Sequence, residues 1–158
     1  MKYICSLITV SDIQRSREFY EHCLHQKVKY DFGENVTFHG DFALHLQSHY
    51  KQLIDNKEIK TGSNNFELYF EFDQLEEMVS DLKAKHVEFI HEIREQPWRQ
   101  KVVRFYDPDQ TIIEVGESME HLCFRLHNDG MSTNKISKAT GLPLEYVEIS
   151  IKNTKNNV

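Results

Sequence analysis

The chain has 158 residues, enough for one ordinary domain that buries roughly 70% of its unfolded surface. Apolar residues make up 39% of it and aromatic residues 11%, which is typical of a folded protein rather than a disordered one. Its 19 basic residues against 25 acidic ones give a formal charge of −6. This balance argues against nucleic acid or an anionic membrane as the main partner, because both are anionic and bind basic surfaces more tightly.

Cysteine usage and the N-terminal sequence indicate a reducing, cytoplasmic compartment. The three cysteines form no CxxC pair, and an odd count is poor material for a disulfide framework. The N-terminal apolar run, YICSLITV, is too short to cross a membrane and lacks a small-residue cleavage site. Its β-branched and aromatic content predicts a strand instead.

The first part of the chain predicts a strand, a helix and then three strands. After the run ending at Val10, Asp12 is a plausible helix N-cap, and apolar residues then recur at helical spacing as far as Cys23. Strand-like segments follow at 28–32, 35–39 and 42–47, separated by glycine-containing turns. We therefore predict that residues 1–47 form one βαβββ module.

The same order of elements returns later in the chain. An alternating strand, FELYFEF, ends at Asp73, which matches Asp12 as an expected helix cap, and an amphipathic helix follows at 75–85. Three more strands are expected at 87–93, 101–106 and 111–116, with an Asp-Pro-Asp turn between the last two. We predict a second βαβββ module over 66–117, joined to the first by a polar linker over 48–65.

Side-chain alternation assigns the faces of these strands. In FELYFEF, the four apolar residues from Phe66 to Phe72 share the face expected under the helices. The opposite faces of the strands carry a mostly polar set that includes possible metal ligands. A solvated sheet face explains the same set equally well, and alternation alone cannot bring its members together. The set comprises Cys5, Thr9, His45, Gln47, Glu67, Tyr69, Glu71, Ile112 and Glu114.

Residues 118–158 lie outside both modules and predict a helical tail. Gly130 and Gly141 are expected helix ends, and Ser132 and Pro143 are expected helix starts. The pattern is similar to a helix-turn-helix. From Glu117 onward, however, five basic residues are balanced by five acidic ones, which disfavours DNA binding. We expect a packing appendage that covers a sheet edge or stabilises a dimer.

Two stretches carry a resemblance to a known superfamily. They are ITVSDIQRSREFYEHCL in the first module and EQPWRQKVVRFYDPDQTIIEV at the end of the second. Together they resemble the vicinal oxygen chelate superfamily, which includes glyoxalase I, bleomycin-resistance proteins and extradiol dioxygenases. The resemblance implies an α+β fold in which two βαβββ modules form a concave, mostly antiparallel sheet cleft. It also implies a small-molecule substrate and a homodimer.

Metal-dependent members take one ligand from the first strand and one from the last strand of each module. Carried over to this sequence, the resemblance implies Cys5, His45, Glu67 and Glu114 as ligands of a divalent ion, namely nickel, zinc, manganese or iron. Four positions depart from the usual pattern, among them Lys101, which stands where arginine is usual. Cys5 stands where histidine is usual, and Arg99 and Gln110 stand where glycine is usual.

The resemblance leaves two functions open. The first is a metal-dependent lyase or isomerase acting on a 2-oxoaldehyde adduct, with Glu114 or Glu67 moving the proton. The second is a metal-free protein of the bleomycin-resistance type that binds a small molecule against aromatic walls. A ring-cleaving dioxygenase is less favoured, because such enzymes generally use two histidines. Substrate contacts are expected from Thr9, Gln47, Tyr69 and Trp98, with Phe32 and Phe38 as further candidate walls.

Overall fold

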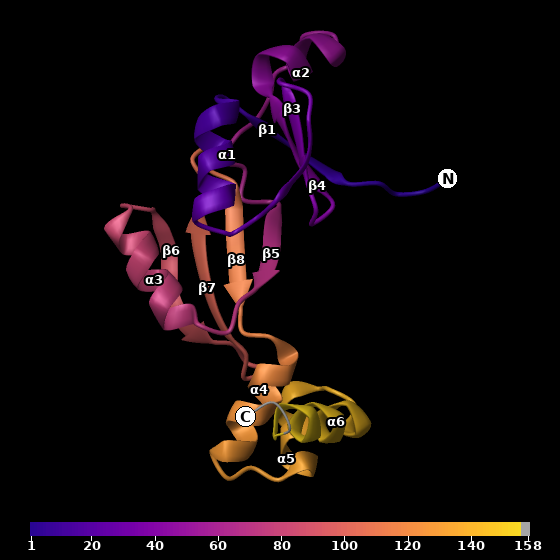
Figure 1. The fold of residues 1–158 in the computed structure, drawn as a ribbon, viewed down its shortest axis with the longest axis vertical. Coiled ribbons are helices and arrows are strands. Elements are labelled where there is room, and N and C mark those ends of the chain that lie inside the picture. Colours follow the sequence, from indigo (N-terminus) through magenta and orange to yellow (C-terminus); the bar gives the residue numbers. More distant parts are fainter. Residues whose placement is uncertain (156–158) are drawn as a thin grey trace. The chain divides into compact units, whose positions relative to one another are not determined.

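The computed structural model describes residues 1–155, and Figure 1 shows its elements. The chain divides into two compact units. Unit 1 contains Met1–Glu67 and Tyr106–Ile112, and unit 2 contains Leu68–Phe105 and the residues from Ile113 onward. Two four-stranded mixed sheets with helices beside them confirm the predicted α+β class.

The first module has the predicted order of elements. Its strands are β1 (Ser6–Val10), β2 (Val28–Asp31), β3 (Asn35–Phe38) and β4 (Phe42–Leu46), and α1 (Ile13–His22) follows β1. The sheet order is β1-β4-β3-β2, with β1 parallel to β4 and the other pairs antiparallel. The Asp12 side chain accepts a hydrogen bond from the Arg15 amide, so the predicted N-cap of α1 is confirmed.

A helix that the sequence did not predict begins directly after β4. Helix α2 (Gln47–Leu53) occupies part of the segment expected to be a polar linker, and Gln47 is its first residue rather than the end of a strand. The helix has no buried residue and no side-chain cap. A helix that buries no side chain needs no apolar stripe, which explains why the sequence pattern carried no signal for it.

The second module repeats the arrangement. Its strands are β5 (Glu67–Glu71), β6 (Phe89–Glu95), β7 (Lys101–Tyr106) and β8 (Ile112–Gly116), in the order β5-β8-β7-β6, and α3 (Leu75–Ala84) follows β5. The prediction that Asp73 caps this helix is wrong. The N-cap of α3 is Gln74, without a side-chain bond, and the Asp73 carboxylate instead accepts the Ser118 amide at 2.8 Å.

Strand alternation predicted the core faces in part, because on β4 the opposite face is buried too, at Ala43 and His45. In β1 the side chains of Ile8 and Val10 are buried, whereas Leu7 on the opposite face is 43% exposed. In the second module Leu68 is half-buried, but Phe66, predicted for the same face, is 48% exposed. Phe66 precedes the first residue of β5, so the alternation of the strand does not control its direction.

The Asp-Pro-Asp turn between β7 and β8 belongs to unit 1 and is tied to α1. The Tyr20 hydroxyl, fully buried, donates to the Asp107 carboxylate at 2.8 Å. The Asp109 carboxylate accepts from the hydroxyls of Ser11 at 2.5 Å and Ser16 at 3.0 Å. Burial raises the pKa of Asp107, whereas for Asp109 the opposing hydrogen bonds from Ser11 and Ser16 outweigh burial and lower the pKa.

The tail is helical, as predicted, and has a core of its own. It consists of α4 (Met119–Asn128), α5 (Thr133–Thr140) and α6 (Leu144–Lys155). Gly141 ends α5 in the left-handed conformation that the sequence suggested. Within residues 1–155, no helix is long and apolar enough to cross a membrane. The core of the tail is built from Leu122, Cys123, Leu126, Ile136, Val147 and Ile151.

Candidate functional site

The register of the first module separates two of the predicted metal ligands. Strands β1 and β4 pair in parallel with Thr9 opposite His45. Cys5 precedes β1 and lies four residues before Thr9. At about 3.3 Å per residue, this places Cys5 roughly 13 Å from the level of His45 along the strands. The residue of this strand that the structure brings beside His45 is therefore Thr9, not Cys5.

The His45 imidazole is buried, and its closest polar partner comes from α2. Its Nε2 lies 2.9 Å from Nδ1 of His49, which in turn lies 3.3 Å from a carboxylate oxygen of Glu34. The Tyr50 ring also packs beside it, with ring centroids 5.5 Å apart. Burial, with a smaller contribution from His49, lowers the pKa of His45. Among the described residues, its buried Nδ1 atom has no hydrogen-bond partner.

Glu114 is buried in the second module, and a cation neutralises it. Its carboxylate forms an ion pair with the guanidinium of Arg104 on β7. Arg104 also approaches the next strand, β6, where its Nη1 donates to Nε2 of His91 at 3.4 Å. Glu114 therefore ends a row of polar side chains that crosses three strands of the sheet.

These contacts do not assemble a metal centre within either unit. In the described part of each unit, no three His, Cys, Asp or Glu side chains are gathered in a way that could hold an ion. Glu114 already forms an ion pair with Arg104, and Cys5 lies four residues along the strand from the level of His45. The fourth predicted ligand, Glu67, is an exposed residue at the start of β5. The four-residue ligand set remains a prediction.

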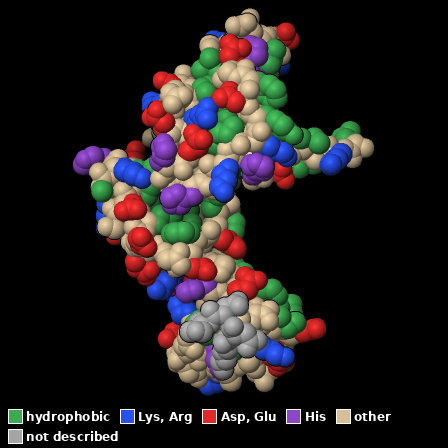
Figure 2. Space-filling view, in the orientation of Figure 1, with side chains coloured by type: hydrophobic (Ala, Val, Ile, Leu, Met, Phe, Trp, Pro, Cys, Tyr) green, Lys and Arg blue, Asp and Glu red, His purple; other side chains and the backbone are tan. Residues whose placement is uncertain are grey.

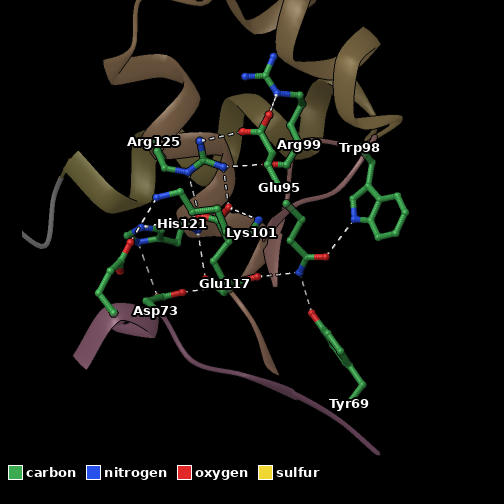
Figure 3. A network of polar contacts seen from close by, with 12 residues as sticks. Tyr69, Asp73, Glu95, Trp98, Arg99, Lys101, Glu117, His121 and Arg125 are labelled. Carbon is green, nitrogen blue, oxygen red and sulfur yellow. Dashed lines mark hydrogen bonds and ion pairs between the residues drawn. The ribbon is translucent and has the colours of Figure 1, made fainter. Parts of the chain in front are cut away.

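Two predicted substrate-binding residues of unit 2 are joined by a third residue that the sequence analysis missed. Gln100 is only 2% exposed, yet its amide is hydrogen-bonded to two exposed aromatic side chains, Trp98 and Tyr69, which Figure 3 labels. The Trp98 indole N–H donates to Gln100 Oε1 at 3.0 Å, and Gln100 Nε2 donates to the Tyr69 hydroxyl at 2.8 Å. Trp98 is 40% exposed and Tyr69 46% exposed. We call Tyr69, Gln100 and Trp98 the aromatic wall.

A glycine on β8 leaves room for this arrangement. A Cβ atom at Gly116 would lie 2.7 Å from Gln100 Nε2 and 3.2 Å from the Tyr69 hydroxyl oxygen. The Tyr69 hydroxyl itself donates to Glu71 at 3.0 Å. Burial raises the pKa of Tyr69 to about 12, so the group stays a protonated hydroxyl at neutral pH. The wall therefore presents two fixed rings and no formal charge of its own.

The remaining predicted contacts line separate hollows of unit 1. Thr9 lines a hollow of about 380 Å³ together with Phe66 and Asp109. Gln47 lines another of about 440 Å³ with Ser11 and Lys51. The structure therefore does not bring Thr9 and Gln47 into one hollow, although alternation placed them on one sheet face.

Sequence reasoning missed Arg104 and Gln100 for different reasons. Arg104 is on β7, directly after a buried valine, and a lone charge on a strand normally indicates a solvated face. Its pairing with Glu114 depends on which strands are neighbours. Gln100 lies in a turn, where an amide carries no recognisable signal. Its position two residues after Trp98 was the one available hint.

Comparison with known proteins agrees with this architecture. Residues 3–120 match the family described as glyoxalase-like domain. A protein of unknown function from Agrobacterium tumefaciens str. C58 is 40% identical, with a TM-score of 0.68 over 75% of this chain and 95% of that one. No curated protein matches the chain. The matched family region ends within α4, so most of the helical tail lies beyond it.

More distant solved structures share the fold. A glyoxalase/bleomycin resistance protein/dioxygenase from Nocardioides is 17% identical, with a TM-score of 0.60 over 74% of this chain and 83% of that one. Lactoylglutathione lyase from Agrobacterium tumefaciens is 18% identical, with a TM-score of 0.57 over 74% and 93%. The chain belongs to the glyoxalase-like domain family, within the vicinal oxygen chelate superfamily.

Proposed function

We propose that this protein binds a small molecule with a flat, apolar part and does so without a metal ion, in the manner of a bleomycin-resistance protein. The observation that carries the proposal is the aromatic wall. Large aromatic side chains left half-exposed and held in place by a buried hydrogen-bonding group are typical of ligand sites, where they combine apolar contact with a fixed orientation.

The wall is pre-organised, which favours binding. The Gln100 amide uses both its oxygen and its nitrogen to fix the two rings, so neither ring must be ordered when a ligand arrives. Glu114, the residue that the enzyme hypothesis needs as a ligand or base, is instead paired with Arg104. A carboxylate held by a guanidinium is a weaker base and a weaker metal ligand than a free one.

Titration of the intrinsic fluorescence tests the proposal, because Trp98 is the one tryptophan of the chain. Bleomycin, which carries a flat heteroaromatic group, and 8-anilinonaphthalene-1-sulfonate serve as probes. We expect saturable quenching of Trp98 by at least one of them and an affinity about 3- to 10-fold lower in Tyr69→Ala. Tyr30→Ala, which removes an exposed tyrosine of the first module, is the matched control. Absence of saturable quenching with both probes would refute the proposal.

The metal-dependent lyase is the second candidate, and one observation favours it. His45 Nδ1 is buried and lacks a partner among the described residues, and an imidazole lone pair of this kind can bind a divalent ion. His45 would be one ligand, and the family resemblance implies Cys5, Glu67 and Glu114 as the others, although Cys5 lies about 13 Å from His45 along the strands of one chain. Elemental analysis of protein purified without chelators or a histidine tag tests this candidate. Near-stoichiometric nickel, zinc, manganese or iron that falls in His45→Ala would support it.

A further inference from the structure

A continuous chain of hydrogen bonds links the aromatic wall to the helical tail (Figure 3). Besides holding the Tyr69 hydroxyl, Gln100 Nε2 donates to the main-chain carbonyl of Glu117 at 2.8 Å. Glu117 is only 1% exposed, and its carboxylate accepts the Lys101 amide at 2.8 Å. Both its carboxylate oxygens also receive the Arg125 guanidinium, at 2.6 and 3.0 Å. Arg125 belongs to α4, the first helix of the tail.

The same guanidinium holds the turn that carries Trp98. Arg125 Nη2 donates to the main-chain carbonyl of Arg99 at 2.7 Å. Arg99 has a φ of +74°, the left-handed region that residues other than glycine rarely adopt, so this turn is strained. Such a conformation persists only where surrounding contacts impose it. Here those contacts lie on both sides of the turn: the Arg125 guanidinium on residue 99 and the Glu117 carboxylate on residue 101.

We propose that Arg125 and Glu117 are positioning residues for ligand binding: the tail fixes the Trp98–Gln100 turn and thereby sets the geometry of the aromatic wall. The inference rests on the proposed ligand-binding function of the wall. Neither residue belongs to the wall. Arg125 also lies beyond residues 3–120, the region that matches the family. The tail is thus a functional support for the site and not only a packing appendage.

A purely structural role makes a different prediction. If the ion pair only attached the tail, its loss would lower the stability of the folded protein and leave the surroundings of Trp98 unchanged. If it positions the turn, its loss changes both the exposure of Trp98 and the affinity of the wall. The sole tryptophan therefore separates the two roles without any ligand, which a stability measurement alone could not do.

Arg125→Met is the first variant, because methionine keeps apolar bulk and removes every donor. We expect greater collisional quenching of Trp98 by acrylamide and an affinity for 8-anilinonaphthalene-1-sulfonate about 5- to 10-fold lower than in the wild type. Lys83→Met is the matched control, because it breaks an exposed ion pair of the same unit, with Glu92, that does not touch the network. It should leave both readouts unchanged. Circular dichroism establishes that each variant is folded.

Two further variants keep the test decisive if Arg125→Met fails to fold. Arg125→Lys retains the charge but cannot make all the contacts of the guanidinium fork, so it should show a smaller change in the same direction. Gly116→Ala leaves the tail untouched and places a methyl group against Gln100 Nε2. Gly116→Ala, like Arg125→Met, should lower the affinity for 8-anilinonaphthalene-1-sulfonate.

The outcomes separate this inference from the function on which it rests. Folded Arg125 variants with wild-type quenching of Trp98 and wild-type probe affinity would overturn the positioning role, even if the wild type binds the probe tightly. A wild type that binds no probe would overturn the proposed function. In that case the acrylamide readout of the unliganded protein still decides whether Arg125 positions the turn.

Discussion

The last strand of each module carries a polar residue on the corresponding face, but the surroundings of the two residues differ. On β4, His45 is covered by side chains of α2, the helix that begins at once after the strand, and it keeps a buried nitrogen without a partner among the described residues. On β8, Glu114 is neutralised by Arg104 from the neighbouring strand. The internal repeat therefore places polar side chains at similar points of each module. The segments and strands that surround them decide whether they are available for chemistry.

The segments after the two last strands differ as well. After β4 the chain forms the short helix α2, whose residues are not buried. After β8 it enters α4, and the Glu117–Arg125 pair binds that helix back to the turn before β7. The basic and acidic side chains on the face drawn in Figure 2 are interspersed, without a continuous basic patch. The tail is attached to the second module through the Glu117–Arg125 pair.

The largest expected effect comes from placing an acid in the first module at a buried position whose cross-strand neighbours carry no charge. Ala43 is 2% exposed on β4, and its cross-strand neighbours are Leu7 and Thr37. Ala43→Glu would bury an unpaired carboxylate, so we expect it to lower the free energy of unfolding by about 3 kcal/mol or more. Urea unfolding followed by circular dichroism measures this.

Leu7→Glu is the matched control for that variant. Leu7 lies on the neighbouring strand beside Ala43 but is 43% exposed, so its carboxylate would remain hydrated. We expect a change below about 1 kcal/mol. Equal losses of unfolding free energy in the two variants would show that a carboxylate at position 43 is as well hydrated as one at position 7.

In the second module the corresponding experiment removes an acid. Glu114→Gln leaves Arg104 without its carboxylate, and we expect a loss of about 2 kcal/mol, less than for a fully buried pair because Arg104 is partly exposed. The double variant Glu114→Gln/Arg104→Met should recover part of that loss in the same unfolding experiment. A double variant as unstable as the sum of the two single variants would show that the two side chains do not act as a pair.

The two turns in which usual glycines are replaced provide a third comparison. Gln110 has a φ of +66° and Arg99 a φ of +74°, both in the left-handed region. Gln110→Gly should raise the free energy of unfolding by about 1 kcal/mol, because it relieves strain there. Arg99→Gly should gain less, because the Arg99 side chain also pairs with Glu95 at 2.7 Å. Thermal unfolding of both variants shows which one gains more stability, and a larger gain for Arg99→Gly would contradict the prediction.

The smallest effect is a pH dependence specific to His45. Burial lowers its pKa in the folded protein below the ordinary 6.5, so the unfolded chain binds the proton more readily. Its contribution to stability is therefore complete above about pH 6.5 and is lost as the pH falls toward the lowered value of the folded state. We expect the melting temperature to fall between about pH 7.5 and 5.5 more steeply in the wild type than in His45→Asn. Equal slopes of melting temperature against pH in the two proteins would contradict this prediction.

Much of the fold could be predicted because its signals are local. The alternation in FELYFEF, the helical spacing after Asp12 and the Asp-Pro-Asp turn each depend on residues close together in the chain. The same reasoning failed where another contact competed. Asp73 resembles a cap, but the Ser118 amide, 45 residues away, takes its carboxylate. Helix α2 has no buried stripe, so periodicity showed no sign of it.

The sequence by itself determined the two βαβββ modules, the helical tail, the family and the faces on which Glu114, Tyr69 and His45 lie. Periodicity and turn chemistry are properties of neighbouring residues, and they survive without knowledge of the fold. Only the tertiary structure decided which of these side chains meet a partner. Strand order brings Arg104 to Glu114, parallel register separates Cys5 from His45, and the return of α4 brings Arg125 to the turn beside Gln100. The last two arrangements involve residues far apart in the chain, and the Arg104–Glu114 pair depends on the register of two neighbouring strands, which alternation alone does not fix.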